Sequence, residues 1–326
     1  MSHQGRDVAS RQVGFIGVGS MGWPMALRLR QAGFSVVAYD AVDGHAEKFA
    51  RESGSQAAGT CAELAAQCDV IVTMLPTSAI VEQVLTGETG VLAGVREGTV
   101  IIEMSSGVPT HTRLLAEKAR QAGCVLVDAP VSGGVPRART GELSIMFGGP
   151  AEVLEDVRPV LQAMGTTVQH TGEVGSAHAM KALNNLVSAG GFLIGIEALL
   201  IGQRFGLSAD LMVDVLNAST GMNNSTQKKF KQFVLSREFN SGFGLDLMVK
   251  DLTIALGLGT ETSTPTPFAA LCREMWASAG QALGKGQDHT DVARLSEMLA
   301  GTTLGGTTVG GNAPGGTPPG DKASSK

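Results

Sequence analysis

The first half of the chain alternates short hydrophobic runs with segments of helical periodicity, such as 21–32 and 109–122. Several of the runs are hydrophobic almost without interruption, as expected for strands covered on both faces of a sheet. The alternation predicts an α/β fold with a mostly parallel, doubly wound, Rossmann-type sheet. The predicted strands are 13–17, 35–40, 70–75, 99–104, 125–129, 143–147 and 167–171.

Strand patterns stop after about Gly175, and helical periodicity continues to residue 300. The first helix expected there would be about 45 Å long at the usual rise per residue, long enough to pass from one domain into another. We therefore expect a dinucleotide-binding domain at 12–174 and an all-helical domain for substrate binding and oligomerisation at 175–300. The predicted helices are 176–205, 209–218, 245–260, 265–282 and 290–299.

The two ends of the chain differ from the rest. Residues 1–11 are polar and lack the hydrophobic core of a signal peptide. Residues 301–326 consist mostly of small and polar residues that cannot bury enough surface to offset the entropy of ordering. We expect both segments to be disordered. The most hydrophobic stretch, 186–201, contains Glu197 and three glycines and is short for a membrane span, so a buried helix is expected.

Composition narrows the function classes. The net charge of −5 provides no basic excess for binding nucleic acid. The four cysteines form no CxxC pair and no cluster with the spacing of a zinc site, which indicates a reduced cytoplasmic protein without a structural metal. The expected partners are therefore a small-molecule substrate and further copies of the chain, with no nucleic acid and no membrane.

A glycine-rich motif links the first predicted strand to the first predicted helix. Gly17 permits the tight turn, Gly19 lets the backbone approach a pyrophosphate, and Gly22 allows close helix–strand packing. Ser20 and Met21 complete the motif at the helix N-terminus, which supplies N–H donors and partial positive charge for phosphates. A dinucleotide site is predicted; a glycine-rich turn without a ligand is the alternative.

Asp40 ends the second predicted strand, 18 positions after Gly22. A carboxylate at this place accepts hydrogen bonds from the ribose hydroxyls of NAD and repels the 2′-phosphate of NADP. No arginine occurs at 39–44. The predicted cofactor is therefore NAD, while Lys48 and Arg51 leave NADP as the less favoured alternative.

Four motifs, taken in order, resemble the β-hydroxyacid dehydrogenase family, which includes 3-hydroxyisobutyrate dehydrogenase and tartronate semialdehyde reductase. The resemblance covers about residues 12–300. In one departure, Ala177 and His178 stand where the family commonly has Gly and Gln, which alters a wall of the expected pocket. The motifs are Gly14–Gly22 with Pro24-Met25-Ala26, Asp128–Gly134, Gly175–Asn185 with Lys181, and Lys250-Asp251-Leu252.

The resemblance implies a role for residues in each motif. Lys181 would be the catalytic residue, and Asn185 would contact the substrate. Ser132, Gly133 and Gly134 would hold the substrate carboxylate. The residues expected on the cofactor side are Met74, Leu75, Pro76 and Ser106 near the nicotinamide ribose, and Lys250 as a cofactor or substrate contact.

The residues of the lysine motif also suit this chemistry on physical grounds. Lys181 and Asn185 are four positions apart and share one helix face. The positive end of the helix dipole, and Lys250 if it is close, should lower the pKa of Lys181. Such an amine can accept the hydroxyl proton as hydride leaves. His178, one turn earlier, either orients the substrate or supports the site from behind.

Three further features have ordinary structural interpretations. The cluster Lys228-Lys229-Phe230-Lys231 is interpreted as a solvated face, with an anion site as the alternative. Asp251 either holds Lys181 or Lys250 in place or pairs elsewhere. Gly190, Gly191 and Gly195 weaken the long helix, and we expect close packing between subunits or across the domain joint to compensate, in a homodimer or homotetramer.

The predicted activity is hydride transfer between NAD and the 3-hydroxyl carbon of a small 3-hydroxy acid, as in 3-hydroxyisobutyrate dehydrogenase, giving a semialdehyde or oxo acid. Tartronate semialdehyde reductase and L-threonate dehydrogenase are alternatives within this chemistry. Imine reductases typically lack the catalytic lysine, and 6-phosphogluconate dehydrogenase needs a longer helical region and basic residues for phosphate. A non-catalytic NAD(P)-binding protein is the alternative of another class.

Overall fold

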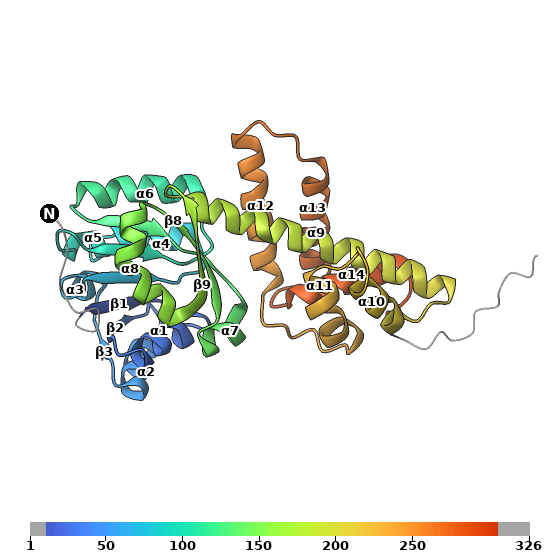
Figure 1. Ribbon diagram of the computed structural model, residues 1–326, viewed down its shortest axis with the longest axis horizontal. Helices are drawn as coiled ribbons and strands as arrows, with labels where there is room; N and C mark the ends of the chain where they lie inside the picture. The colour runs from blue at the N-terminus through green and yellow to red at the C-terminus, as the bar shows by residue number, and fades with distance from the viewer. Residues whose placement is uncertain (1–10, 306–326) are drawn as a thin grey trace, which may run out of the picture.

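The computed structural model describes residues 11–305, in which one long helix joins a sheet-containing part to a helical part (Figure 1). One nine-stranded sheet has the order β3-β2-β1-β4-β5-β6-β8-β7, with β9 pairing with β8. Its strands are β1 Gln12–Ile16, β2 Ser35–Tyr39, β3 Gln56–Ala57, β4 Val70–Thr73, β5 Val100–Glu103, β6 Val125–Asp128, β7 Val131–Ser132, β8 Leu143–Gly148 and β9 Gly165–Gly172.

Strands β1 to β6 run parallel, so their carboxyl ends meet at one edge of the sheet. Chain order reverses between β1 and β4, and a crevice for ligands is expected at such a point. Strand β8 pairs antiparallel with β6 and β7. The mostly parallel, doubly wound sheet confirms the predicted fold.

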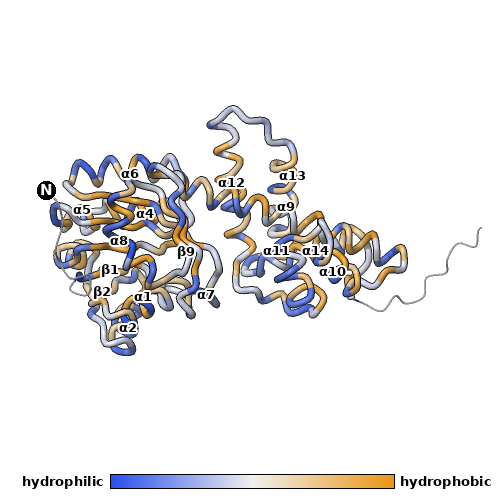
Figure 2. The backbone as a smooth tube through the Cα atoms, in the orientation of Figure 1, coloured by the Kyte–Doolittle hydropathy of each residue, from blue (hydrophilic) through white to orange (hydrophobic). Residues whose placement is uncertain are grey.

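Helices cover both faces of the sheet because alternate strand residues point to opposite sides. Phe15 and Val72 pack toward one layer, while Ile16 and Ile71 pack toward the other. Figure 2 shows hydrophobic residues concentrated along these strands. The first layer contains α1 Gly22–Gln31, α2 His45–Ser53, α7 Gly134–Thr140 and α8 Ala151–Met164; the second contains α3 Cys61–Ala65, α4 Ser78–Thr86, α5 Val91–Gly94 and α6 Pro109–Gln121.

The helical part is built around α9 Ser176–Phe205, which leaves the sheet and crosses the remaining helices (Figure 1). Phe192 of α9 lies in the hydrophobic core of the helical part. Its ring centroid is 5.3 Å from that of Phe230 and 5.9 Å from that of Trp276. The other elements are α10 Ala209–Asn217, α11 Asn224–Lys228, the π-helix η2 Phe230–Leu235, α12 Leu245–Glu261, α13 Pro267–Leu283, the 3-10 helix η3 His289–Asp291 and α14 Val292–Ala300.

The glycines of α9 admit neighbours from the same chain. A Cβ atom on Gly195 would lie 2.6 Å from the ring of Phe230, and one on Gly190 would lie 3.2 Å from Phe268. A Cβ atom on Gly191 would lie 3.4 Å from the side-chain amide of Asn223. Close packing at these glycines is confirmed, but the neighbours belong to the helical part of the same subunit, so the expected place of that packing, between subunits or across the domain joint, was wrong.

Parts of both ends are ordered against the structure, contrary to expectation. Arg11 forms an ion pair with Asp156 of α8. Leu304 is buried, and its N–H donates to Glu297 at 2.9 Å. Disorder was therefore the wrong prediction for Arg11 and for 301–305, because each is held by a carboxylate of the folded part. The rest of these two predictions, 1–10 and 306–326, lies outside the described residues.

By length and composition α9 would pass as a membrane-spanning helix. However, 56% of its most apolar window is buried inside the protein, and core helices of soluble proteins meet the same criterion. Its first turn contacts the sheet, and its middle packs against Phe230 and Trp276. We therefore treat α9 as the central helix of the helical part.

Candidate active site

The glycine-rich turn follows β1 at the point where the sheet order reverses. Gly17 has φ +95°, and a Cβ atom there would lie 2.4 Å from the carbonyl oxygen of Met74. A Cβ atom on Gly22 would lie 1.8 Å from the carbonyl oxygen of Gly17. Only glycine fits these two positions. Gly19 is exposed with nothing within 4 Å of its Cβ position, so a ligand can approach the backbone there.

Asp40 fixes the shape of this turn from the end of β2. Its Oδ2 accepts the N–H of Val18 at 2.8 Å, and its Oδ1 accepts the N–H of Val42 at 2.9 Å. The side chain is only 11% exposed. Each carboxylate oxygen has a further lone pair, so Asp40 can hold the loop and still accept from a ribose hydroxyl.

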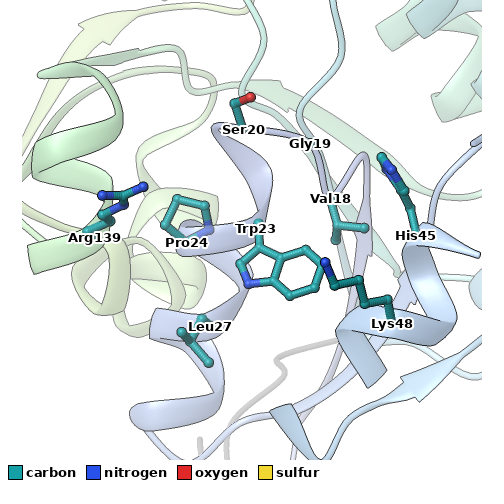
Figure 3. Close-up of a pocket in the computed structure, with 9 residues that line it drawn as sticks. All are labelled: Val18, Gly19, Ser20, Trp23, Pro24, Leu27, His45, Lys48 and Arg139. Atoms are coloured by element: carbon teal, nitrogen blue, oxygen red, sulfur yellow. The ribbon is translucent and has the colours of Figure 1, made fainter. Parts of the chain in front are cut away.

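A cavity of about 640 Å³ lies beside the turn (Figure 3). Lys48 reaches from α2 toward the ring of Trp23 on α1, with its Nζ atom 5.7 Å from the ring centroid. The basic side chains provide a positive field next to exposed backbone, which suits the phosphates of a dinucleotide. The cavity is lined by Val18, Gly19, Ser20, Trp23, Pro24, Leu27, His45, Lys48 and Arg139.

The residues expected near the nicotinamide follow β4 and β5 at the same sheet edge. Leu75 donates its N–H to the hydroxyl of Ser105 at 2.8 Å, and its side chain lies against Gly17. Pro76 is exposed beside it. Ser106 donates its hydroxyl to Asp251 of α12 at 2.7 Å. The structure therefore places these residues at the same edge of the sheet as the glycine-rich turn.

Asp251 is a buried acceptor that ties three elements together. It accepts from Ser106 after β5 and from the amide of Asn185 on α9, at 2.6 Å. The amine of Lys250 lies 3.1 Å from its Oδ1 and donates to the carbonyl oxygen of Ser106 at 2.6 Å. Of the alternatives considered for Asp251, the structure shows the pairing with Lys250. The Asn184 amide donates in turn to Asn185, at 3.1 Å.

His178 lies in the first turn of α9 with both ring nitrogens engaged. Its Nε2 atom is 2.8 Å from Glu103 and 3.0 Å from the carbonyl oxygen of Ser105. Its Nδ1 atom is 2.8 Å from the hydroxyl of Thr112. The ring is fully buried, which agrees with the expected role of supporting the site from behind.

The groups around His178 favour its protonated form. Burial alone would lower its pKa, but the charge and hydrogen bond of Glu103 and the charge of Asp128 raise it. Burial alone would raise the pKa of Glu103, and the imidazolium and the Ser105 hydrogen bonds lower it. Burial raises the pKa of Asp128 despite its neighbours. Asp128 also accepts the backbone N–H groups of Gly175 and His178, at 2.7 and 2.8 Å, which fixes the start of α9.

Lys181 lies one turn further along α9 and has a different environment. Among residues 11–305, no hydrogen bond or ion pair reaches its amine. Burial lowers its pKa; the charge of Asp251 opposes this shift, and the charge of Lys250 adds to it. Lys181 is thus an enclosed amine, near the Asp251 cluster, with an increased fraction of the neutral form.

Ser132 ends β7, Gly133 follows it and Gly134 begins α7, all beyond the carboxyl end of β6. The two glycines have φ +129° and +64°, a backbone that L-residues rarely adopt. Within the described part of the chain the Ser132 hydroxyl has no hydrogen-bond partner, and no hydrogen bond or ion pair joins this turn to Lys181. Its free hydroxyl and backbone N–H groups suit an anionic ligand.

The position of the Lys229 side chain differs from the one that the sequence pattern predicts. Lys228 and Lys231 lie on the surface as predicted, and Lys231 pairs with Asp214 at 2.7 Å. Lys229 instead turns inward, with its amine 2.7 Å from Nε2 of His289. It was wrong to assign it to a solvated face, because the helix changes from α11 to the π-helix η2 at this residue.

Two protein families match the two parts of this chain. Residues 12–172 match the family described as the NAD binding domain of 6-phosphogluconate dehydrogenase. Residues 175–296 match the family described as NAD-binding of NADP-dependent 3-hydroxyisobutyrate dehydrogenase.

Individual relatives cover nearly the same region. The 2-(hydroxymethyl)glutarate dehydrogenase of Eubacterium barkeri is 37% identical over 90% of this chain and 98% of its own length. Mitochondrial 3-hydroxyisobutyrate dehydrogenase of Mus musculus is 36% identical over 83% of each chain. The solved structure of Mycobacterium tuberculosis 3-hydroxyisobutyrate dehydrogenase with L-serine has a TM-score of 0.81 and 31% identity, covering 88% of this chain and 99% of that one.

Proposed function

Because the chain belongs to the β-hydroxyacid dehydrogenase family, we propose that it transfers a hydride between NAD and the 3-hydroxyl carbon of a small 3-hydroxy acid. The product is a semialdehyde or oxo acid. The observation that carries this proposal is the enclosed, unpartnered amine of Lys181 beside the Asp251 cluster. An amine with a lowered pKa and no protein partner is suited to exchange a proton with a substrate hydroxyl.

Each group of the site has a role in this reaction. Lys181 accepts the hydroxyl proton during oxidation and returns it during reduction. Asn185, held by Asp251, orients the substrate from the same face of α9. The N–H groups and hydroxyl of Ser132, Gly133 and Gly134 bind the substrate carboxylate. His178 keeps the first turn of α9, and hence Lys181, against the sheet.

The residues around the glycine-rich turn fit a dinucleotide. Gly17, Gly19, Ser20, Met21 and Gly22 present backbone at the start of α1. Leu75, Pro76 and Ser106 follow β4 and β5 at the same edge of the sheet, and Lys250 donates to the carbonyl oxygen of Ser106. When bound, the dinucleotide supplies the carbon that accepts or donates the hydride.

We favour NAD over NADP because the Asp40 carboxylate disfavours a 2′-phosphate. Lys48, His45 and Arg139 in the adjacent cavity argue for NADP. The carboxylate is held by two backbone N–H groups in the position expected for a ribose contact, so we give it more weight.

The surface of α9 supports a homo-oligomer. Val187, Ile194, Ile201 and Phe205 are between 56% and 86% exposed and form a stripe at seven- and four-residue spacing. Such a hydrophobic stripe on a 30-residue helix is typical of an interface with a second copy. We expect sedimentation to show a dimer or larger assembly; a species of 33.5 kDa would contradict this.

Kinetics with a panel of substrates tests the activity. We would measure kcat/KM for 3-hydroxyisobutyrate, glycerate and threonate with both NAD and NADP, with 2-hydroxybutyrate, a 2-hydroxy isomer of 3-hydroxyisobutyrate, as the control. The expected result is turnover of a 3-hydroxy acid with a higher kcat/KM for NAD. Cofactor binding without turnover of any compound would favour a non-catalytic protein instead.

A further inference from the structure

Lys229 is a second amine directed into the helical part, and the assigned chemistry does not use it. It precedes η2, and its Nζ atom is 2.7 Å from Nε2 of His289. Among residues 11–305, no carboxylate forms an ion pair with it. Lys250, by contrast, has Asp251 at 3.1 Å.

His289 accepts from Lys229 as a neutral ring. Its Nδ1 atom is 2.9 Å from the hydroxyl of Ser241 and 3.2 Å from the carbonyl oxygen of Phe243. Burial lowers its pKa, the nearby Asp288 opposes this shift, and the charge of Lys229 adds to it. A neutral ring with the proton on Nδ1 donates to Phe243 and leaves Nε2 free to accept from the amine. His289 therefore positions Lys229 without neutralising its charge.

Asp288, the nearest acidic group, already has its donors. It accepts from the hydroxyl of Ser241, from the N–H groups of Gly242 and Phe243, and from the N–H and hydroxyl of Thr290. These bonds hold the loop before α12 against η3. Asp288 acts on Lys229 through its charge at a distance, with no direct hydrogen bond between them.

Lys229 lies beside α9, the helix that carries Lys181. The ring of the adjacent Phe230 packs against Gly195 of α9, and the ring centroid of His289 lies 6.1 Å from that of Phe192. Burial lowers the pKa of Lys229 to about 8; Asp288 opposes this shift, and the charge of Lys181 adds to it. A half-buried amine without a carboxylate partner is costly when charged, and an anion bound beside it would offset that cost.

We propose that Lys229, positioned by His289, binds a second anionic group of the substrate, so that the preferred substrates are 3-hydroxy dicarboxylic acids. This inference rests on the proposed function, in which Lys181 acts at the hydroxyl and the 132–134 turn holds the carboxylate nearest to it. Lys229 approaches from the helical part, where the far end of a longer substrate would extend. A monocarboxylate would leave its charge unpaired.

Matched substrates and matched lysine variants test the inference. We would compare 3-hydroxypropionate with 2-(hydroxymethyl)glutarate, which adds a distal carboxylate, in the full-length protein. We expect the parent to prefer the diacid. Lys229→Met should lower kcat/KM for the diacid by about 10- to 100-fold, mostly through KM, because one charge-assisted hydrogen bond is lost. The loss for the monoacid should be much smaller. The exposed Lys228→Met is the control and should retain the preference.

The results of this comparison distinguish a failure of the Lys229 assignment from a failure of the proposed function. Equal losses on both substrates, or a parent that oxidises the monoacid without preferring the diacid, would overturn the role of Lys229 and leave the activity standing. If neither acid transfers a hydride to NAD, both the role of Lys229 and the proposed function are overturned. Lys229→Gln keeps a donor for His289 and serves in place of Lys229→Met if that variant does not fold, with the same outcomes.

Discussion

His178 and Lys181 lie one turn apart on α9, yet their side chains have opposite environments. His178 is fully buried, with Glu103, Ser105 and Thr112 around its two ring nitrogens. Lys181 is enclosed but has no partner among the described residues. Both are basic side chains in the first two turns of one helix, so the difference arises from the neighbours that pack around each.

This contrast separates a structural charge from a functional one. A buried cation that is fully paired holds elements together, and removing it leaves carboxylates exposed to a low-dielectric interior. An enclosed amine without a partner costs stability, and such a cost is common where a ligand completes the site. The variants below should therefore change stability at His178 and turnover at Lys181.

The largest effect is expected for Lys181→Met. We predict a fall in kcat of about 10²- to 10⁴-fold, because the group that takes the hydroxyl proton is lost. The dissociation constant for NAD, measured by fluorescence titration, should stay close to the parent value. Lys228→Met, a change of the same kind at an exposed position, should leave kcat unaltered. Retention of the parental rate in Lys181→Met would remove this residue from the mechanism.

His178→Ala should act mainly on stability. We predict a loss of about 3–5 kcal/mol in the free energy of unfolding, because Glu103 and Asp128 lose their counter-ion. The raised pKa of His178 makes its stabilisation complete below the ordinary histidine value of 6.5, and the contribution is lost as the pH rises through the raised folded-state pKa. Denaturant titrations of parent and variant across this range would show the difference. Equal stability at low pH would mean that the ring is not a paired cation.

Sequence patterns were sufficient for the elements with strong local signals. The bounds of α9 were predicted because glycines with positive φ, Gly175 and Gly206, lie at its two ends. Strands β3 and β7 were not predicted, because two residues cannot show a period-two pattern.

The partners within the site depend on tertiary structure. His178 meets Glu103 and Thr112 from distant strand and helix ends, and no local spacing indicates that pairing. Lys229 was misplaced because its direction depends on the transition to a π-helix. The sequence motifs and the family resemblance therefore identified the candidate site residues. The pairing of His178 with Glu103 and of Lys229 with His289 could be seen only in the structure.

Asp40→Ala should have a smaller effect, on cofactor choice. We predict that NAD binds about tenfold more weakly, because a charge-assisted hydrogen bond to the ribose is lost. Preference over NADP should decrease for the same reason. Titrations with both dinucleotides would measure this. An unchanged ratio of the two dissociation constants would show that Asp40 only holds the loop through Val18 and Val42.

The smallest effects are expected from the neighbours of Lys181. Removing the charge in Lys250→Met should raise the pKa of Lys181, and Asp251→Asn should lower it. In alcohol oxidation the neutral amine is required, so kcat/KM rises with pH up to this pKa. The rising limb should therefore move to higher pH in the first variant and to lower pH in the second. Shifts in the same direction would contradict the assignment of that limb to Lys181.

The most direct test of the central claim is the rate of NAD reduction by Lys181→Ala with and without added ethylamine. The account predicts loss of nearly all turnover, followed by partial recovery that grows with the concentration of the neutral amine. The parental rate without added amine would contradict the claim that Lys181 exchanges the proton with the substrate hydroxyl.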